Sequence, residues 1–351
     1  MENRDNDLMR QQELENCSFI KTVLMILVVF YHSILFWGGN WFTETPVFEA
    51  KPLGYVAQWL TSFHIYAFTL ISGYLFYCLK FEKGKYGPFI PFVRNKAKRL
   101  LIPYCFTTVL WVIPISCIYY PEFCDWRTLI HKFLLGISPS QLWFLLMLFF
   151  VFVIAWCLSS LWKKHDFLSI VITFAFCGVG ILGAKVLPNV YQIWTACKYL
   201  ILFLIGFKIR QHGSALLMKI PSLVWLAADL LFFWLERCIP DTGSPIGQIL
   251  KLGISFCVNI FGAVMAFVVL QKIASKISYK NNKTIALLTK TSMAVYLFHQ
   301  QVIYVFLDVL NGLINPYLHA GITFVGAVGV SVLLASLLMK CKATRFLIGE
   351  K

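Results

Sequence analysis

Residues Phe19 to Phe36 read FIKTVLMILVVFYHSILF, an apolar run long enough to cross a lipid bilayer. A membrane helix needs about 20 mainly apolar residues to span a hydrocarbon core about 30 Å thick. This run also holds two ionisable side chains, Lys21 and His32. Ionisable groups inside a membrane span are costly and usually serve a function. The stretch therefore predicts a transmembrane helix that carries part of a functional site.

The composition extends this prediction to the whole chain. Of the 351 residues, 59% are hydrophobic and 13% are charged, whereas a soluble domain carries roughly 25% charged residues. Apolar runs of similar length recur, and the weakly alternating segments of a β-barrel are not seen. We expect an all-α, polytopic integral membrane bundle forming one domain over residues 1–351. Residues 1–18 would be a short polar cytoplasmic N-terminus, without a cleaved signal peptide or an appended soluble domain.

About ten transmembrane helices are expected. The sixth is the shortest, and it begins either near residue 199 or as early as Val190. The ten spans cover roughly residues 19–36, 55–79, 100–119, 142–162, 167–184, 199–209, 218–235, 247–270, 285–310 and 318–339. If the N-terminus is cytoplasmic, 24 of the 31 Lys and Arg residues fall in inside segments and seven in outside segments. Cytoplasmic loops carry such an excess of basic residues. Both termini are therefore predicted to be cytoplasmic, in a multi-pass protein of the cell membrane.

Charge and cysteine content exclude two other classes of site. The net charge of +15 comes from basic residues in the gaps between apolar runs, which form no stripe interleaved with exposed aromatic residues. No nucleic-acid partner is therefore expected. The eleven cysteines include no CxxC pair and no regular spacing. We expect neither a disulfide framework nor a zinc or other metal site.

Three histidines from three expected spans fall at a similar depth. A helical rise of about 1.5 Å per residue places His32 and His299 roughly 20 Å from the cytoplasmic side, and His64 roughly 13 Å from the outer side. An imidazole can take a proton from a hydroxyl and return it to a leaving thiolate. The alternative is that each histidine only bonds a neighbouring helix. Asp229 and Asp308 lie inside spans as well, and either one orients a histidine or bonds another helix.

A basic segment, FVRNKAKRLLIPY, leads into the third span and contains Arg94, Lys96, Lys98 and Arg99. Such a cluster holds the phosphates of a nucleotide or acyl carrier, or it simply follows the positive-inside rule. Lys21 has the same two interpretations, because a lysine near the end of a span can extend its ammonium group to the interface.

Two further stretches have a local signature. Ser72-Gly73-Tyr74 places small residues in an aromatic span, which favours close helix approach. Trp143 follows Gln141 at the outer start of the fourth span, a position at which tryptophan often anchors a helix in the interface.

Five of these segments, in order, resemble the membrane-bound acyltransferase family 3, the O-acetylases of bacterial polysaccharides and related acceptors. The resemblance covers about residues 16 to 340. Its motifs are Lys21 and His32 with ten residues between them, SFHIYAFTLISGYLF (Ser62–Phe76), NKAKRLLIPY (Asn95–Tyr104), QLWFLLMLF (Gln141–Phe149) and SMAVYLFHQQV (Ser292–Val302).

The chain departs from the family pattern at several positions. Lys21 stands where arginine is commoner, so it offers a point charge and no bidentate contact. Asn95 replaces a basic residue and Gln141 stands where histidine is frequent. Gln300 and Gln301 stand where prolines often follow the late histidine.

The resemblance implies a transfer reaction. Acetyl-CoA, or another short acyl-CoA, would enter from the cytoplasm with its phosphates on Lys96, Arg99, Lys98 and Arg94. His32 and Lys21 would be the catalytic residues, and the substrate would contact His64, Ser72, Trp143 and His299. The acceptor would be a hydroxyl of a cell-surface glycan or of its lipid-linked precursor, reached among membrane lipids.

Two other classes of function remain open at this point. A transporter that exports a polysaccharide or small solute could use the same histidines, although paired Gly/Pro-interrupted helices are not found in corresponding halves. A non-catalytic membrane scaffold would leave the three histidines at one depth without an explanation.

Overall fold

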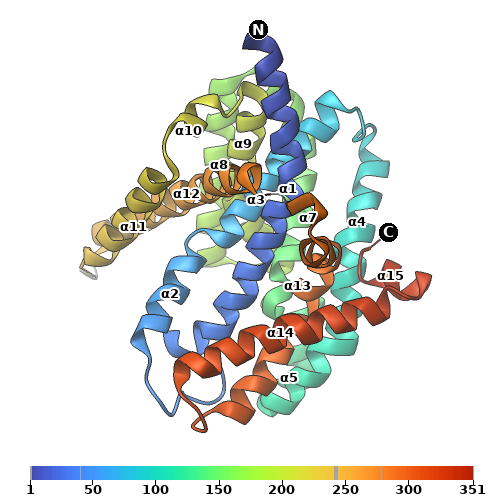
Figure 1. The fold of residues 1–351 in the computed structure, drawn as a ribbon, viewed down its shortest axis with the longest axis vertical. Helices are drawn as coiled ribbons and strands as arrows, with labels where there is room; N and C mark the ends of the chain where they lie inside the picture. Colours follow the sequence, from blue (N-terminus) through green and yellow to red (C-terminus); the bar gives the residue numbers. More distant parts are fainter. Residues whose placement is uncertain (1, 40, 241–243, 278, 351) are drawn as a thin grey trace.

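The computed structural model describes residues 2–39, 41–240, 244–277 and 279–350. Within them the chain forms helices joined by turns and short loops (Figure 1). The long helices are α1 (Glu2–Ile34), α3 (His64–Tyr77), α4 (Phe89–Thr107), α7 (Trp143–Lys164), α8 (Asp166–Val186), α9 (Ile193–His212), α11 (Ser222–Cys238), α12 (Pro245–Lys276), α13 (Lys283–Leu310) and α14 (Pro316–Leu338). The prediction of an all-α, polytopic membrane bundle is confirmed.

Shorter elements complete the spans. They are α2 (Lys51–Thr61), α5 (Ile113–Tyr119), α6 (Trp126–Leu129), α10 (Ala215–Lys219) and α15 (Lys342–Leu347), the 3-10 turns η1 (Leu35–Gly38), η4 (Pro121–Phe123), η6 (Ser140–Leu142), η7 (Val190–Gln192) and η8 (Tyr279–Asn281), and the π-helical turns η2 (Cys78–Glu82), η3 (Thr108–Val112) and η5 (Ile130–Leu134). The π turn η3 joins α4 to α5, and the segment from Phe89 to Tyr119 is continuous apart from this change of pitch.

Nine stretches in the described residues are long and apolar enough to cross a membrane. The remaining expected span corresponds to α11, whose 17 residues make a helix roughly 25 Å long. The sixth span has the earlier of the two starts that the sequence left open, at Val190. It occupies α9 and the turn before it, Val190–His212, and not residues 199–209 alone. Lys198 interrupts the apolar run in the sequence, but the helix continues through it.

Several loops assigned to the two sides of the membrane lie at opposite ends of the bundle. At one end, Asn311 Nδ2 donates to the Glu44 carboxylate at 3.0 Å, and the Tyr120 hydroxyl donates to the Trp41 carbonyl at 3.3 Å. Figure 1 shows the N-terminus at the other end, far from the turn between α13 and α14. There Gln211 donates to the Lys163 carbonyl at 3.0 Å. This grouping agrees with the expected alternation of loops.

A buried polar network closes the end of the bundle that carries the N-terminus. The Arg210 guanidinium binds both carboxylate oxygens of Glu82, at 2.8 and 2.7 Å, and donates to the Tyr74 hydroxyl at 2.8 Å. The Tyr74 hydroxyl donates to Glu13 at 2.7 Å, and Ser214 bonds the same carboxylate. Buried charges need such partners. The network therefore fixes α1, α3 and α9 relative to one another.

Glycines set the distance between α3 and α9. A Cβ atom at Gly73 would lie 1.9 Å from the Phe203 carbonyl oxygen, and one at Gly206 would lie 1.8 Å from the Leu70 carbonyl oxygen. No side chain fits at either position. The close approach expected at Ser72-Gly73-Tyr74 is confirmed, and Gly206 supplies the matching contact from the other helix.

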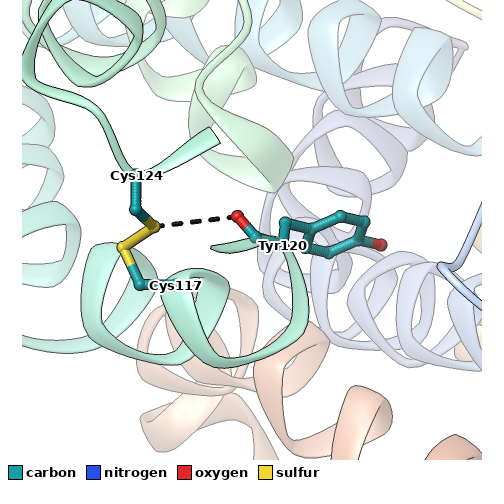
Figure 2. Close-up of a disulfide and its surroundings, with 3 residues drawn as sticks. All are labelled: Cys117, Tyr120 and Cys124. Atoms are coloured by element: carbon teal, nitrogen blue, oxygen red, sulfur yellow. Dashed lines mark hydrogen bonds between the residues drawn. A yellow bond between two sulfur atoms is a disulfide. The ribbon is translucent and has the colours of Figure 1, made fainter. Parts of the chain in front are cut away.

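A disulfide corrects one expectation. Cys117 at the end of α5 is bonded to Cys124, seven residues later, and the Cys124 sulfur lies 3.7 Å from the Tyr120 carbonyl oxygen (Figure 2). No disulfide framework was expected because the cysteines form no CxxC pair and have no regular spacing. Disulfides persist in oxidising compartments, and this one lies beside the loops that were assigned to the outside.

Candidate active site

Helix α1 presents one continuous face from Lys21 to His32. At 3.6 residues per turn, residues eleven positions apart lie within about 20° of each other around the helix axis and about 16 Å apart along it. Lys21 and Met25 both line a cavity inside the bundle, and His32 follows on the same face. The spacing of this pair therefore aligns a cation near one end of the helix with an imidazole near its other end.

His32 and His299 form a direct pair between α1 and α13. Nδ1 of His32 lies 3.2 Å from Nε2 of His299, and the two ring centroids are 5.0 Å apart. Nδ1 of His32 also lies 2.9 Å from the carbonyl oxygen of Val28. His299 is fully buried, whereas His32 keeps part of its surface accessible. Of the two imidazoles, His32 is the one that another molecule can reach.

The hydrogen bonds determine which nitrogens carry protons. Nδ1 of His299 lies 3.1 and 2.8 Å from the carbonyl oxygens of Val295 and Tyr296, so it must be the donor. In a neutral imidazole the other nitrogen is then an acceptor. Nε2 of His299 therefore accepts a hydrogen bond, and Nδ1 of His32 is the donor that the Val28 carbonyl oxygen and His299 Nε2 share. Nε2 of His32 is left with a free lone pair, which is the form a general base requires.

His64 lies close to this pair but does not bond to it. Its Nδ1 donates to the Leu60 carbonyl. The Tyr31 ring lies between the two histidines, with its centroid 4.8 Å from that of His32 and 5.0 Å from that of His64. On another side of His32, the Trp41 ring lies at 5.7 Å. The three histidines that the sequence placed at a similar depth therefore do lie in one region. His64 lies outside the hydrogen-bonded pair.

An inner cavity of about 420 Å³ reaches toward the histidine pair. Its walls come from α1, α3, α4, α7 and α13 together with the C-terminal residues Gly349 and Glu350. Its polar lining includes Lys21, Ser72, Lys96, Arg99, Tyr296 and Glu350. The Tyr296 ring centroid is 6.1 Å from that of His299. The cavity therefore connects a cationic region to the neighbourhood of His32 and His299.

Lys96 lies in an aromatic setting without a carboxylate. Its ammonium group lies 3.4 Å from the centroid of the Phe152 ring and 4.7 Å from that of the Tyr86 ring, and it donates to the Tyr86 hydroxyl at 3.0 Å. Among the described residues, neither Lys21 nor Arg99 makes a salt bridge. Three cations that line one cavity without a salt bridge form a site for an anion with several charges.

The other two basic residues of the segment lie elsewhere. Arg94 and Lys98 are exposed and line an apolar groove on the outer face of α4. Residues 94 and 98 lie on one side of a helix, and residues 96 and 99 lie on roughly the opposite side. The structure therefore brings Lys96 and Arg99 to the inner cavity together with Lys21, and it does not bring Arg94 and Lys98 there.

Ser72 and Trp143 also differ in position. Ser72 lines the inner cavity, and its hydroxyl donates to the Phe68 carbonyl at 2.9 Å. Trp143 packs against the Tyr199 ring at 5.9 Å and is not part of the cavity wall.

Two departures from the family pattern are partners in the structure. Nε2 of Gln141 donates to Oε1 of Gln301 at 2.8 Å, and Nε2 of Gln301 donates to Oε1 of Gln141 at 3.1 Å. Tyr296 also donates to the Gln141 carbonyl. This pair of amides attaches α13 to the start of α7 beside His299. Neither Gln141 nor Gln301, considered alone in the sequence, indicates that the two side chains bond to each other.

Glu350 is the site residue that the sequence analysis missed. It lies near the cations in the inner cavity, where burial raises the pKa of its carboxyl group and Arg99 and Lys21 partly offset the rise. Gly349 allows this arrangement. It has a φ of +77°, and a Cβ there would lie 2.8 Å from Pro103 and 3.0 Å from the Arg99 carbonyl oxygen. Nothing in the composition of the last residues signals this contact, because it depends on where the chain folds back.

Comparison with known proteins agrees with the motifs. A family model described as an acyltransferase domain matches residues 16–338, which is nearly the whole chain. No curated protein and no solved structure shows significant similarity to this chain. The matched region contains Lys21, the basic segment of α4 and both histidines of the pair. On this evidence the chain belongs to the acyltransferase 3 family.

Proposed function

We propose that this protein transfers a short acyl group, acetyl in the first instance, from acyl-CoA to a hydroxyl of a cell-surface glycan or of its lipid-linked precursor. His32 is the general base. The observation that carries the proposal is the His32–His299 pair, with Nε2 of His32 as the free acceptor, near the Tyr296 wall of a cavity lined by three cations. A membrane acyltransferase needs both features, a base at the reacting hydroxyl and a binding site for an anionic donor.

The positive charges that line the inner cavity make it the proposed binding site for the acyl-CoA donor. Coenzyme A carries phosphate groups at its nucleotide end, and Arg99 offers a planar fork that suits phosphate whereas Lys21 and Lys96 offer point charges. The apolar walls between these cations and Tyr296 suit the pantetheine arm. A donor bound in this way has its thioester near the histidine pair and its nucleotide toward the cytoplasm.

His32 can account for every proton that moves in the transfer. Nε2 of His32 removes the proton of the acceptor hydroxyl while that oxygen attacks the thioester carbonyl carbon. The carbon–sulfur bond then breaks, and the CoA thiolate takes the proton back from Nε2. The Val28 carbonyl and Nε2 of His299 both accept from Nδ1 of His32 and so keep its Nε2 available. General base catalysis of this kind contributes roughly 10²- to 10⁴-fold in rate.

The proposal is tested with purified protein, radiolabelled acetyl-CoA and extracted cell glycans. Wild-type protein should give label that alkali releases as acetate, and His32→Ala should lose it. His165→Ala is the matched control, because His165 is exposed between α7 and α8. Transport of glycan into proteoliposomes without acyl transfer would contradict the proposal and favour a transporter.

A further inference from the structure

Within the described residues, three rings pack around the imidazole of His32. The centroids of the Tyr31 and His299 rings lie 4.8 and 5.0 Å from that of His32, and the centroid of the Trp41 ring lies at 5.7 Å. Tyr31 and His299 belong to α1 and α13, whereas Trp41 lies in the loop between η1 and α2, at the end of the bundle opposite the N-terminus (Figure 1). Trp41 therefore contacts His32 from the side of the outside loops.

Trp41 also lies away from the proposed donor site. The inner cavity is lined by Tyr296, which comes three residues before His299 on α13, and Trp41 is not part of its wall. The Trp41 ring lies instead 5.5 Å from the ring of Tyr304, which comes five residues after His299. A molecule that contacts Trp41 and His32 together therefore approaches from beyond the histidine pair, as the acceptor must.

The backbone of Trp41 is held at two points. Its N–H donates to the Gly39 carbonyl at 2.8 Å, and its carbonyl accepts from the Tyr120 hydroxyl at 3.3 Å. Tyr120 lies in the turn that the Cys117–Cys124 disulfide closes (Figure 2). Trp41 is thus positioned beside His32 before a substrate arrives, and such pre-organisation lowers the entropy lost on binding.

The indole N–H of Trp41 is a free donor: no hydrogen-bond partner for it lies in the part of the chain that the structure describes. The indole of Trp37, four residues earlier, instead donates to the Phe48 carbonyl at 3.1 Å. A tryptophan N–H usually finds a partner when protein surrounds it, and Trp41 keeps part of its surface accessible. This donor is therefore available to a bound molecule, beside the imidazole that has a free lone pair on Nε2.

We propose that Trp41 binds the acceptor and determines which hydroxyl reaches His32. The indole N–H donates to an oxygen of the acceptor, and the reacting hydroxyl donates to Nε2 of His32. An indole suits this task because its face offers apolar contact while its single polar group fixes the orientation of the ligand. The proposal rests on the proposed acyl transfer and adds a specificity-determining residue to it.

The test removes the indole N–H and keeps the ring. Benzothienylalanine at position 41 has the shape of tryptophan with sulfur in place of the N–H group, and Trp41→Phe is a second variant without the donor. With labelled acetyl-CoA, both should raise the KM for extracted cell glycans roughly three- to tenfold, the size expected for one lost hydrogen bond between uncharged groups. The kcat, the pH–rate profile and the KM for acetyl-CoA should stay as in wild type. Trp126→Phe, at an exposed position of α6, is the matched control.

The position of the transferred acetyl group gives a second measurement. Wild-type protein should acetylate mainly one hydroxyl of the glycan, as read by NMR of the product. Both variants at position 41 should give a broader mixture of positions, because the N–H no longer orients the acceptor. A residue that only supported the His32 ring would slow the transfer without changing its position.

Each outcome bears on either this proposal or the proposed function. An unchanged KM for the glycan with an unchanged position of transfer would overturn the role of Trp41 and leave acyl transfer intact. A raised KM for acetyl-CoA would place Trp41 at the donor site and would also overturn it, as would a lower kcat with an unchanged KM for the glycan. No transfer to any glycan by the wild-type protein would contradict the proposed function and, with it, this proposal.

Discussion

Replacing Arg99 by methionine is expected to weaken the binding of acyl-CoA without changing the fold. Methionine keeps the apolar stem of the side chain and removes only the guanidinium group that lines the inner cavity. Arg94→Met is the matched control, because the same substitution is made five positions earlier on the same helix, where the side chain lines the lipid-facing groove. Each variant removes one positive charge from α4, but the two charges lie on different sides of the helix.

The magnitude follows from the contacts that the cavity offers. A hydrogen bond to a charged group contributes about 1.5–3 kcal/mol, and about 1.4 kcal/mol corresponds to a tenfold change in Kd. Arg99→Met should therefore raise the Kd for acetyl-CoA roughly tenfold to 150-fold. Arg94→Met should change it less than about threefold, since the Arg94 side chain lines the groove on the other side of the helix and not the inner cavity.

The assay is calorimetric titration of the purified protein with acetyl-CoA and, separately, with S-acetyl-pantetheine, which lacks the nucleotide. If Arg99 binds the nucleotide phosphates, the effect of Arg99→Met should appear with acetyl-CoA and vanish with the shorter ligand. Equal weakening of both ligands would show a general disturbance of the cavity. An unchanged Kd for acetyl-CoA would refute the assignment of the donor site.

Three further predictions concern His299, Glu350 and Gly73. His299→Gln keeps a second acceptor for Nδ1 of His32 and should retain more acyl transfer than His299→Phe, which leaves only the Val28 carbonyl and should also shift the pH–rate profile. Identical rates and profiles for the two variants would contradict the role given to His299. Glu350 has a raised pKa because of burial, and its ionised form competes with phosphate for Lys21 and Arg99, so acetyl-CoA affinity should fall as the pH rises through this pKa. Glu350→Gln should bind acetyl-CoA several-fold more tightly at neutral pH and lose this pH dependence in calorimetry. Gly73→Ala should destabilise the protein by about 1–3 kcal/mol or more in thermal unfolding, whereas Gly178→Ala, where a Cβ meets no atom within 4 Å, should not.

The sequence predicted the fold well because membrane spans have a strong signature. Phe19–Phe36 and the similar runs after it were recognisable by length and composition alone. The predicted helix boundaries were less accurate where a polar residue interrupts an apolar run, as Lys198 does within α9. The disulfide was missed because Cys117 and Cys124 approach only when α5 ends and the chain turns back.

The candidate site was predicted in part. The depth estimate grouped His32 with His299, and helix geometry explains why Lys21 lies on the same face as His32. The same geometry could have separated Lys96 and Arg99 from Arg94 and Lys98, since they lie on different sides of α4, but the four were taken as one cluster. Glu350 and the Gln141–Gln301 pair depend on contacts between segments distant in the sequence, which no local pattern reveals.

The most direct test of the account is a single-turnover measurement with His32→Ala. Protein loaded with radiolabelled acetyl-CoA is mixed with excess acceptor, and the rate of acyl transfer is compared with that of wild type while donor binding is measured by calorimetry. The account predicts a rate roughly 10²- to 10⁴-fold lower, with the Kd for acetyl-CoA nearly unchanged because His32 lies beyond the donor cavity. A transfer rate within threefold of wild type would contradict the role of His32 as general base.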